Sequence, residues 1–223
     1  MGQTLTLTAS DHHQFGAYRA DPTTPAIGSI IVLQEIFGIN HHIRSVCDHF
    51  AALGYIAIAP ALFDRIQPNF ESGYSPEEVS KALQFVANAD WSAFMLDIAA
   101  TLATLKNNGP VAVVGFCLGG SLAYRSATQF DGLSAAVCYY GGRIVAFADE
   151  TPHCPLMMHF GETDANIPLS DVEAIRKKRP ECEIYVYPGA NHGFNCDERA
   201  SYHQPSAALS WERTLAFLQR TMG

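Results

Sequence analysis

The sequence predicts an α/β fold: a mostly parallel central sheet with helices on both faces and an antiparallel pair of strands at the N-terminal edge. Short runs of apolar, β-branched residues alternate along the chain with longer segments in which apolar residues recur at helical spacing. The short runs are mostly apolar rather than alternating, which is typical of parallel strands that helices bury on both faces. With 223 residues, 48% hydrophobic and 16% charged, the chain suits a single globular domain over residues 1–223 and excludes a disordered or coiled-coil protein.

The first half of the chain begins with the strands. Residues 5–8 and 15–18 are expected to form the antiparallel edge. Residues 29–33 (SIIVL) and 55–59 (YIAIA) are continuous apolar runs, so each predicts a buried strand, and Pro60 ends the second.

Helices are expected between and after these strands. From Ile43 to residue 53, apolar residues recur at helical spacing, with Asn40 as a candidate cap and Gly54 as a candidate stop. Ser-Pro-Glu-Glu at residues 75–78 places a proline and two acids in a first helical turn and predicts a helix over residues 76–88. Another helix is expected over residues 91–106.

The second half of the chain repeats the alternation. Apolar runs predict strands at residues 111–114, 135–140, 156–160 and 183–187. Helical spacing predicts helices over residues 121–128 and 169–178 and a last helix from about residue 205.

Charge and cysteine content exclude several classes of protein. Lys and Arg number 14 against 22 Asp and Glu, so no basic face is available for nucleic acid or for an anionic membrane. No run approaches 18 continuous apolar residues, and the first residues lack the basic and apolar regions of a signal peptide. The six cysteines form no CxxC pair and no zinc spacing. We therefore expect reduced thiols in a cytoplasmic protein, with no metal and no cofactor.

A glycine-rich turn follows the strand at residues 111–114. The segment Gly115-Phe-Cys-Leu-Gly-Gly120 has the pattern of a nucleophile elbow, with Cys117 where serine is more usual. Glycines suit this turn because it is tight and side chains would clash. The sulfur would lie at a helix N-terminus, where the dipole and the backbone amides favour a thiolate. The alternative interpretation is a buried structural cysteine.

An acid and a base follow two later strands. Asp164 comes after the strand at residues 156–160, and His192 comes after the strand at residues 183–187. Ligands bind beyond the carboxyl ends of such strands, and nucleophile, acid and histidine occur in the chain order of α/β-hydrolases. His192 would take the proton of Cys117, while Asp164 would hold the imidazole tautomer. Taken singly, a turn aspartate and a surface histidine remain alternative interpretations.

A glutamate ends the strand at residues 29–33. Glu35 stands one residue before Ile36, whose amide is a candidate oxyanion donor. A carboxyl group buried there needs a hydrogen-bond partner or a proton, and the thiol of Cys117 is one available partner. The alternative is a solvated glutamate at the end of a strand.

With these motifs on one chain, the sequence resembles the dienelactone hydrolase family of the α/β-hydrolase superfamily. The matching motifs are EIFGIN at residues 35–40, GFCLGG at 115–120, GETDANIP at 161–168, NHGF at 191–194 and ERTLAF at 212–217. The resemblance covers nearly the whole chain. It implies an α/β-hydrolase fold and a catalytic triad of Cys117, Asp164 and His192.

The resemblance also implies roles for residues around the triad. The amides of Ile36 and Leu118 would form the oxyanion hole. Glu35 would pair with Cys117 in the resting enzyme, until substrate displaces it and the thiolate pairs with the histidine. Phe37 and Tyr140 would line the substrate pocket.

Two family positions differ in this sequence. Members that open dienelactone bind its carboxylate with two arginines, and the aligned positions here are Val79 and Cys196. The nearest cations are Lys81 and Arg199. We therefore expect the carboxylate clamp to be absent, or rebuilt from Lys81 or Arg199, and we expect compact neutral substrates to be preferred.

The expected function is cofactor-independent hydrolysis of a small-molecule ester or lactone through a thioester on Cys117. Two alternatives use the same scaffold: attack of the thiolate on an activated phosphotriester, and a non-catalytic redox-sensing or ligand-binding protein. The sequence leaves the oligomeric state open between monomer and dimer.

Overall fold

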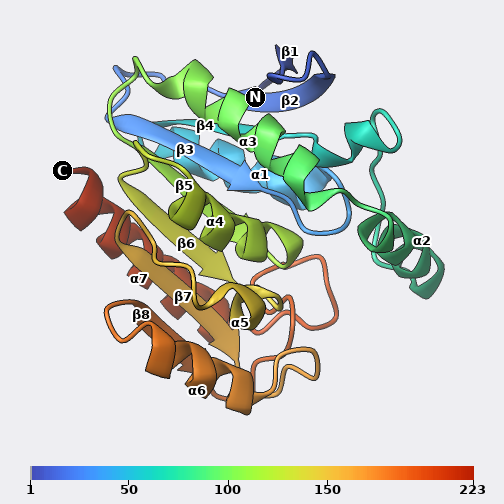
Figure 1. The fold of residues 1–223 in the computed structure, drawn as a ribbon, viewed down its shortest axis with the longest axis vertical. Coiled ribbons are helices and arrows are strands. Elements are labelled where there is room, and N and C mark those ends of the chain that lie inside the picture. The colour runs from blue at the N-terminus through green and yellow to red at the C-terminus, as the bar shows by residue number, and fades with distance from the viewer. Residues whose placement is uncertain (1) are drawn as a thin grey trace. The chain divides into compact units, whose positions relative to one another are not determined.

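The computed structural model describes residues 2–223, and the chain divides into two compact units, Met1–Val111 and Ala112–Gly223 (Figure 1). Each unit contains strands and helices, and each is described by itself. The single domain expected over residues 1–223 remains a prediction.

The first unit contains four strands. They are β1 (Gln3–Thr8), β2 (Gln14–Ala20), β3 (Gly28–Leu33) and β4 (Tyr55–Pro60). Their order is β1-β2-β4-β3, with antiparallel pairs except for β3 and β4, which are parallel. Every residue of β3 and β4 is buried, whereas β1 has none buried, so the antiparallel edge predicted from the sequence is confirmed.

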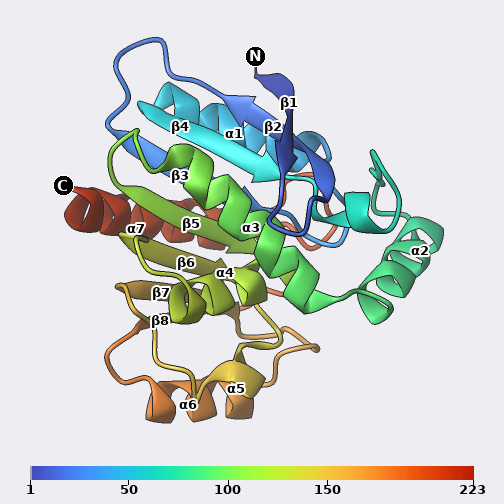
Figure 2. The same cartoon turned by 45° about the horizontal axis from the view of Figure 1, so that its top comes forward.

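The helices of the first unit lie between and after its strands. They are α1 (His41–Ala52), the 3₁₀ helix η1 (Leu62–Arg65), α2 (Pro76–Ala87) and α3 (Trp91–Leu105). The Asn40 side chain accepts the N–H of Ile43 at the start of α1, and Ser75 forms a capping box with Glu78 at the start of α2. Figures 1 and 2 show α1 and α3 on opposite faces of these strands, with α2 set apart from them.

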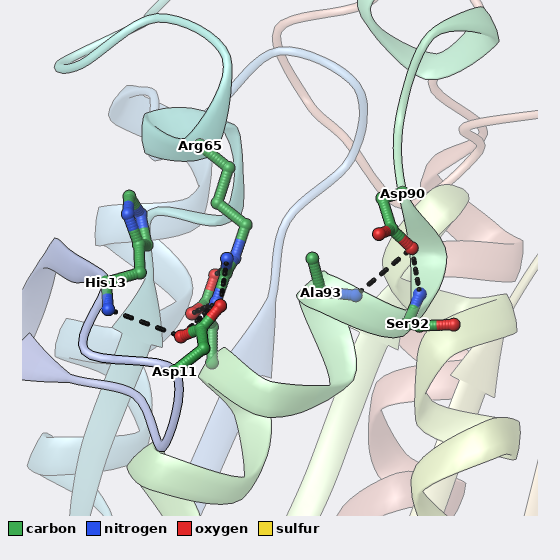
Figure 3. A network of polar contacts seen from close by, with 7 residues as sticks. Asp11, His13, Arg65, Asp90, Ser92 and Ala93 are labelled. Carbon is green, nitrogen blue, oxygen red and sulfur yellow. Dashed lines mark hydrogen bonds and ion pairs between the residues drawn. The ribbon is translucent and has the colours of Figure 1, made fainter.

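An ion-pair network, buried at Asp97 and exposed at Asp11, joins three segments of the first unit (Figure 3). The guanidinium of Arg65 donates two hydrogen bonds to Asp97 on α3, at 2.8 and 2.7 Å, and two to Asp11 in the β1–β2 turn, at 2.8 and 3.1 Å. Asp97 is fully buried, and burial raises the pKa of its carboxyl although Arg65 opposes this rise. The network therefore ties the N-terminal hairpin to α3 through η1.

The second unit is built on four parallel strands in the order β5-β6-β7-β8. They are β5 (Val111–Phe116), β6 (Ala135–Tyr139), β7 (Leu156–Gly161) and β8 (Glu183–Tyr187). The helices are α4 (Leu118–Gln129), α5 (Ile144–Phe147), α6 (Leu169–Lys178) and α7 (Gln204–Met222). In Figures 1 and 2, α4 and α7 lie on opposite faces of the strands. The turns that contain Cys117, Asp164 and His192 follow the ends of β5, β7 and β8.

The predicted strands and long helices are confirmed, and the differences are local. The helix expected from Ser121 begins at Leu118, because the turn after β5 is a single residue. The short helices η1 and α5 were not predicted, since four residues are too few to show a period.

None of the six cysteines forms a disulfide. Burial raises the pKa of Cys154 to about 11 and that of Cys182 to about 12, as expected for unreactive thiols. In the part of the chain that the structure describes, no helix is both long and apolar enough to cross a membrane.

Candidate active site

The turn between β5 and α4 holds Cys117 in a left-handed backbone conformation, with φ of 54° and ψ of −110°. Such a conformation is rare for a residue with a side chain and is found where the surrounding structure enforces it. Its N–H donates to the carbonyl of Tyr139 at 3.0 Å. A Cβ on Gly115 would lie 1.9 Å from the carbonyl oxygen of Gly119, so the elbow requires glycine there.

The structure brings Cys117, His192 and Asp164 together in a chain of hydrogen bonds. The sulfur of Cys117 lies 3.1 Å from Nε2 of His192, and Nδ1 of His192 lies 2.7 Å from Oδ2 of Asp164. The other oxygen of Asp164 accepts the N–H of Asn166 at 2.8 Å. Asp164 is buried and the His192 side chain is 14% exposed. The candidate nucleophile, base and orienting acid therefore form a chain in which each is within hydrogen-bond reach of the next.

The charge state of His192 follows from these contacts. Burial acts to lower its pKa, but the neighbouring sulfur of Cys117 and the hydrogen bonds to Asp164 and Cys117 outweigh burial and raise the pKa to about 10. Protonated His192 can stabilise a thiolate on Cys117. The raised pKa leaves His192 protonated at neutral pH, within hydrogen-bond reach of the Cys117 sulfur.

Thr163 links the turn that carries Asp164 to the turn that carries His192 through hydrogen bonds. Its N–H and its hydroxyl each donate to the carbonyl of Ala190, at 2.9 Å in both cases. Thr163 precedes Asp164 and Ala190 lies two residues before His192. Thr163 lies within the motif GETDANIP, but the sequence analysis assigned it no role, because its contact joins two turns that are far apart in the sequence.

Tyr140, expected to line the pocket, lies against the base. Its backbone φ is 39°, and its N–H donates to the carbonyl of His159 at 2.8 Å. The Tyr140 ring is fully buried, with its centroid 5.1 Å from that of His192 and 5.4 Å from that of Phe194. The ring therefore supports one face of the imidazole.

Leu118 opens α4 directly after Cys117. The first N–H groups of a helix have no partner within the helix, so the amide of Leu118 suits an oxyanion. Leu118 itself is buried, with 5% of its surface exposed.

In the first unit, Glu35, Ile36 and Phe37 follow β3 and are buried. The alternative of a solvated glutamate at position 35 is therefore wrong. The ring of Phe37 meets that of Tyr74 edge-on with centroids 4.7 Å apart, and the Tyr74 hydroxyl accepts from the Asn40 side chain at 2.8 Å. The sequence analysis missed Tyr74, which no motif marks. The pairing of Glu35 with Cys117 remains a prediction.

The two candidate cations have different settings. Lys81 is exposed on α2, and its Nζ lies 5.5 Å from the centroid of the Phe70 ring. The guanidinium of Arg199 packs against Gly193, since a Cβ on Gly193 would lie 2.3 Å from Nη1 of Arg199. Gly193 follows His192 directly, so the structure places Arg199 beside the segment of the base.

Comparison with known proteins gives a consistent result across nearly the whole chain. The model of the dienelactone hydrolase family matches residues 15–222. A putative carboxymethylenebutenolidase from Synechocystis sp. is 37% identical, over 97% of this chain and 96% of that protein. A protein of the same description from Azospirillum brasilense is 32% identical, over 98% of this chain and 99% of that protein.

Solved structures agree with the fold. The crystal structure of a putative dienelactone hydrolase from Klebsiella pneumoniae superposes with a TM-score of 0.84 at 30% identity, covering 97% of this chain and 98% of that one. A dienelactone hydrolase-like promiscuous phosphotriesterase from metagenomic libraries gives a TM-score of 0.78 at 18% identity, covering 100% of this chain and 99% of that one. The α/β-hydrolase fold predicted from the sequence is confirmed.

Proposed function

The chain belongs to the dienelactone hydrolase family, and from this premise we propose that it hydrolyses a small-molecule ester or lactone with Cys117 as nucleophile. The observation that carries the proposal is the chain of hydrogen bonds from Cys117 through His192 to Asp164. The left-handed backbone of Cys117 adds support, because strain of this kind is concentrated at functional sites.

In the proposed reaction, the sulfur of Cys117 attacks the carbonyl carbon of the substrate. The carbonyl oxygen becomes an oxyanion, which the amides of Leu118 and Ile36 stabilise. The C–O bond to the leaving group then breaks, and His192 donates its proton to the departing alkoxide or enolate. His192 next takes a proton from water, the resulting hydroxide attacks the thioester, and the thiolate of Cys117 leaves. Asp164 keeps the imidazole oriented throughout.

Glu35 is proposed to control the ionisation of Cys117 before substrate binds. Its support is the burial of the carboxyl, which must be hydrogen-bonded or protonated to be tolerated. In Glu35→Gln, we expect the pH dependence of Cys117 alkylation by iodoacetamide to change, since the residue has lost its titrating group. An alkylation profile equal to that of the parent protein would argue against this role.

The substrate is proposed to be compact and neutral. The resemblance to family members that open dienelactone implies that Val79 and Cys196 stand where those members carry their clamping arginines. Loss of a charge-assisted hydrogen bond costs about 1.5–3 kcal/mol, so loss of two predicts a reduction of kcat/KM for an anionic substrate of a hundredfold or more, roughly. Arg199, beside the segment of His192, is the residue that would oppose this expectation.

The direct test is a panel of esters, lactones, thioesters and an activated phosphotriester, assayed with the parent protein and with Cys117→Ala. We expect a burst of p-nitrophenol equal to the protein concentration from a p-nitrophenyl ester, and no turnover by the variant. Substantial activity in Cys117→Ala would exclude Cys117 as nucleophile. Peroxide-dependent loss of one thiol with no turnover would instead identify a redox sensor. A reducing, cytoplasmic setting is also part of the proposal, because the six cysteines include no CxxC pair.

The charge preference is tested by comparing kcat/KM for a cis-dienelactone with that for its methyl ester. Faster turnover of the methyl ester is expected. If the free acid is faster, Lys81→Ala and Arg199→Ala identify the cation that binds its carboxylate.

A further inference from the structure

A buried network of side-chain hydrogen bonds lies in the second unit, on residues that the proposed chemistry does not use. The hydroxyls of Tyr139 on β6 and Thr214 on α7 are 2.7 Å apart. Nε2 of His159 on β7 lies 3.1 Å from the Thr214 hydroxyl, and its Nδ1 lies 2.8 Å from the hydroxyl of Tyr187 on β8. All four residues are at most 2% exposed. Three neighbouring strands are thus linked to one helix through their side chains.

The backbone carbonyls of two of these strand residues accept hydrogen bonds from residues of the candidate site that have a strained backbone. The carbonyl of Tyr139 accepts the N–H of Cys117 at 3.0 Å, and the carbonyl of His159 accepts the N–H of Tyr140 at 2.8 Å. Both Cys117 and Tyr140 have positive φ, of 54° and 39°. The backbone of Cys117 and the backbone of Tyr140, whose ring contacts His192, are therefore each hydrogen-bonded to a network residue.

Tyr187, the third strand residue, is hydrogen-bonded to the segments that lead to Asp164 and His192. The carbonyl of Tyr187 accepts the N–H of Glu162 at 3.0 Å and that of Ala190 at 3.2 Å. Glu162 lies two residues before Asp164, and Ala190 lies two residues before His192. The nucleophile, acid and base segments are thus all hydrogen-bonded to backbone groups of residues whose side chains form the network.

The hydrogen-bonding groups of the network constrain one another, because each contact fixes which atom of the next must donate or accept. Burial, with a contribution from Arg213, lowers the pKa of His159 to about 3, so the ring is neutral and donates from one nitrogen while accepting at the other. Polar groups in a core are costly when a partner is missing and specify a unique arrangement when all are paired. Apolar side chains of the same volume would pack these strands without that requirement.

We propose that Thr214, His159, Tyr187 and Tyr139 are positioning residues that set the relative placement of Cys117, Asp164 and His192. The inference rests on the proposed function for its catalytic consequence. Its structural content is independent of the substrate, because the network acts on the distance between the sulfur of Cys117 and the imidazole of His192.

Thr214→Val tests the proposal, because it replaces the shared hydroxyl with a methyl group of similar size on a residue far in sequence from the three segments. We expect two rates to fall about 10- to 100-fold: kcat, and the rate of Cys117 alkylation by iodoacetamide near pH 7. Misplacing reacting groups by up to about an ångström causes losses of this size. KM should change less than twofold, roughly, because no network residue is proposed to touch substrate. Thr214→Ser restores a hydroxyl and should restore both rates.

The matched control is Thr221→Val on the same helix, since the hydroxyl of Thr221 donates only to carbonyls of α7, including that of Phe217 at 2.9 Å. It should leave both rates unchanged. Equal rates in Thr214→Val and Thr221→Val would overturn the proposal, as would a change confined to KM. If Thr214→Val does not fold, Tyr187→Phe, which removes only one hydroxyl, gives the same readouts under the same criteria.

The two proposals fail in different ways. Turnover that persists in Cys117→Ala would overturn the proposed function, whereas the alkylation rate of Cys117 in Thr214→Val would still report whether the network positions the thiol. Normal alkylation in Thr214→Val together with inactive Cys117→Ala would overturn only the network.

Discussion

Gly161 and Ala190 approach so closely that a Cβ on Gly161 would lie 2.5 Å from the carbonyl oxygen of Ala190. Gly161 ends β7, three residues before Asp164, and Ala190 lies two residues before His192. The close backbone contact brings the acid and the base within 2.7 Å of each other. A side chain at position 161 would push these two turns apart.

Gly161→Ala should therefore impair catalysis and stability together. Forcing a methyl group into such a contact costs about 1–3 kcal/mol, and the shifted turns should lower kcat by about tenfold or more. Gly142→Ala is the control, because a Cβ there meets only side-chain atoms of Ile167, at 3.7 Å and beyond. Urea denaturation and ester hydrolysis of the two variants give the comparison. Parent-like activity in Gly161→Ala would show that the turns can move apart without loss.

Cys117→Ala should lower the pKa of His192. Among the interactions that raise this pKa to about 10, the charge of the Cys117 sulfur is the largest, so its removal leaves burial less opposed. Because the pKa of His192 in the folded protein lies above the usual 6.5, its protonation stabilises the folded state. This contribution is complete below pH 6.5 and is lost as the pH rises through about 10. NMR titration of the imidazole C–H signals measures the pKa directly. An unchanged pKa in Cys117→Ala would show that the Cys117 sulfur does not raise the pKa of His192.

His159 should make the protein less stable in acid. Its folded pKa of about 3 lies below the usual 6.5, so the unfolded chain takes up a proton first as the pH falls. Stability is therefore lost progressively from about pH 6.5 downward, amounting to roughly 2 kcal/mol by pH 5. Urea denaturation at pH 7 and pH 5 should show this loss in the parent protein and a smaller loss in His159→Gln, since glutamine does not titrate. The same pH dependence in both proteins would argue against a neutral, buried His159.

Arg65→Met should destabilise the first unit strongly. Asp97 is fully buried and Arg65 donates two hydrogen bonds to it, so the variant leaves a buried carboxyl without its cation. Removing one partner of a buried pair costs about 3–5 kcal/mol. The double variant Arg65→Met/Asp97→Asn should recover part of this loss. Arg19→Met breaks a pair with the 42%-exposed Asp21 and should cost under about 1 kcal/mol. Similar midpoints of urea denaturation for Arg65→Met and Arg19→Met would rule out a stabilising network.

Local sequence pattern was sufficient for the strands, the long helices and the candidate catalytic residue types. Apolar runs show which segments are buried on both faces, and the cap at Asn40 and the box at Ser75 mark helix starts through side chains close in sequence. The elbow at Cys117 is readable because Gly115 is required by a contact with Gly119, only four residues along the chain. The order of cysteine, aspartate and histidine after their strands indicated the candidate site before any distance was known.

Contacts between distant segments were decided only in the folded chain. Cys117 and His192 are 75 residues apart in sequence, and their 3.1 Å contact depends on the register of four parallel strands. The same register places the side chains of Tyr139, His159 and Tyr187 in one network, although each looks like an ordinary strand residue in sequence. Hydrophobic periodicity is a local property that reports burial, whereas the pairing of particular atoms is set by strand register and by tight backbone contacts. The sequence alone therefore determined the kinds of group at this site, and only the tertiary structure decided how they meet.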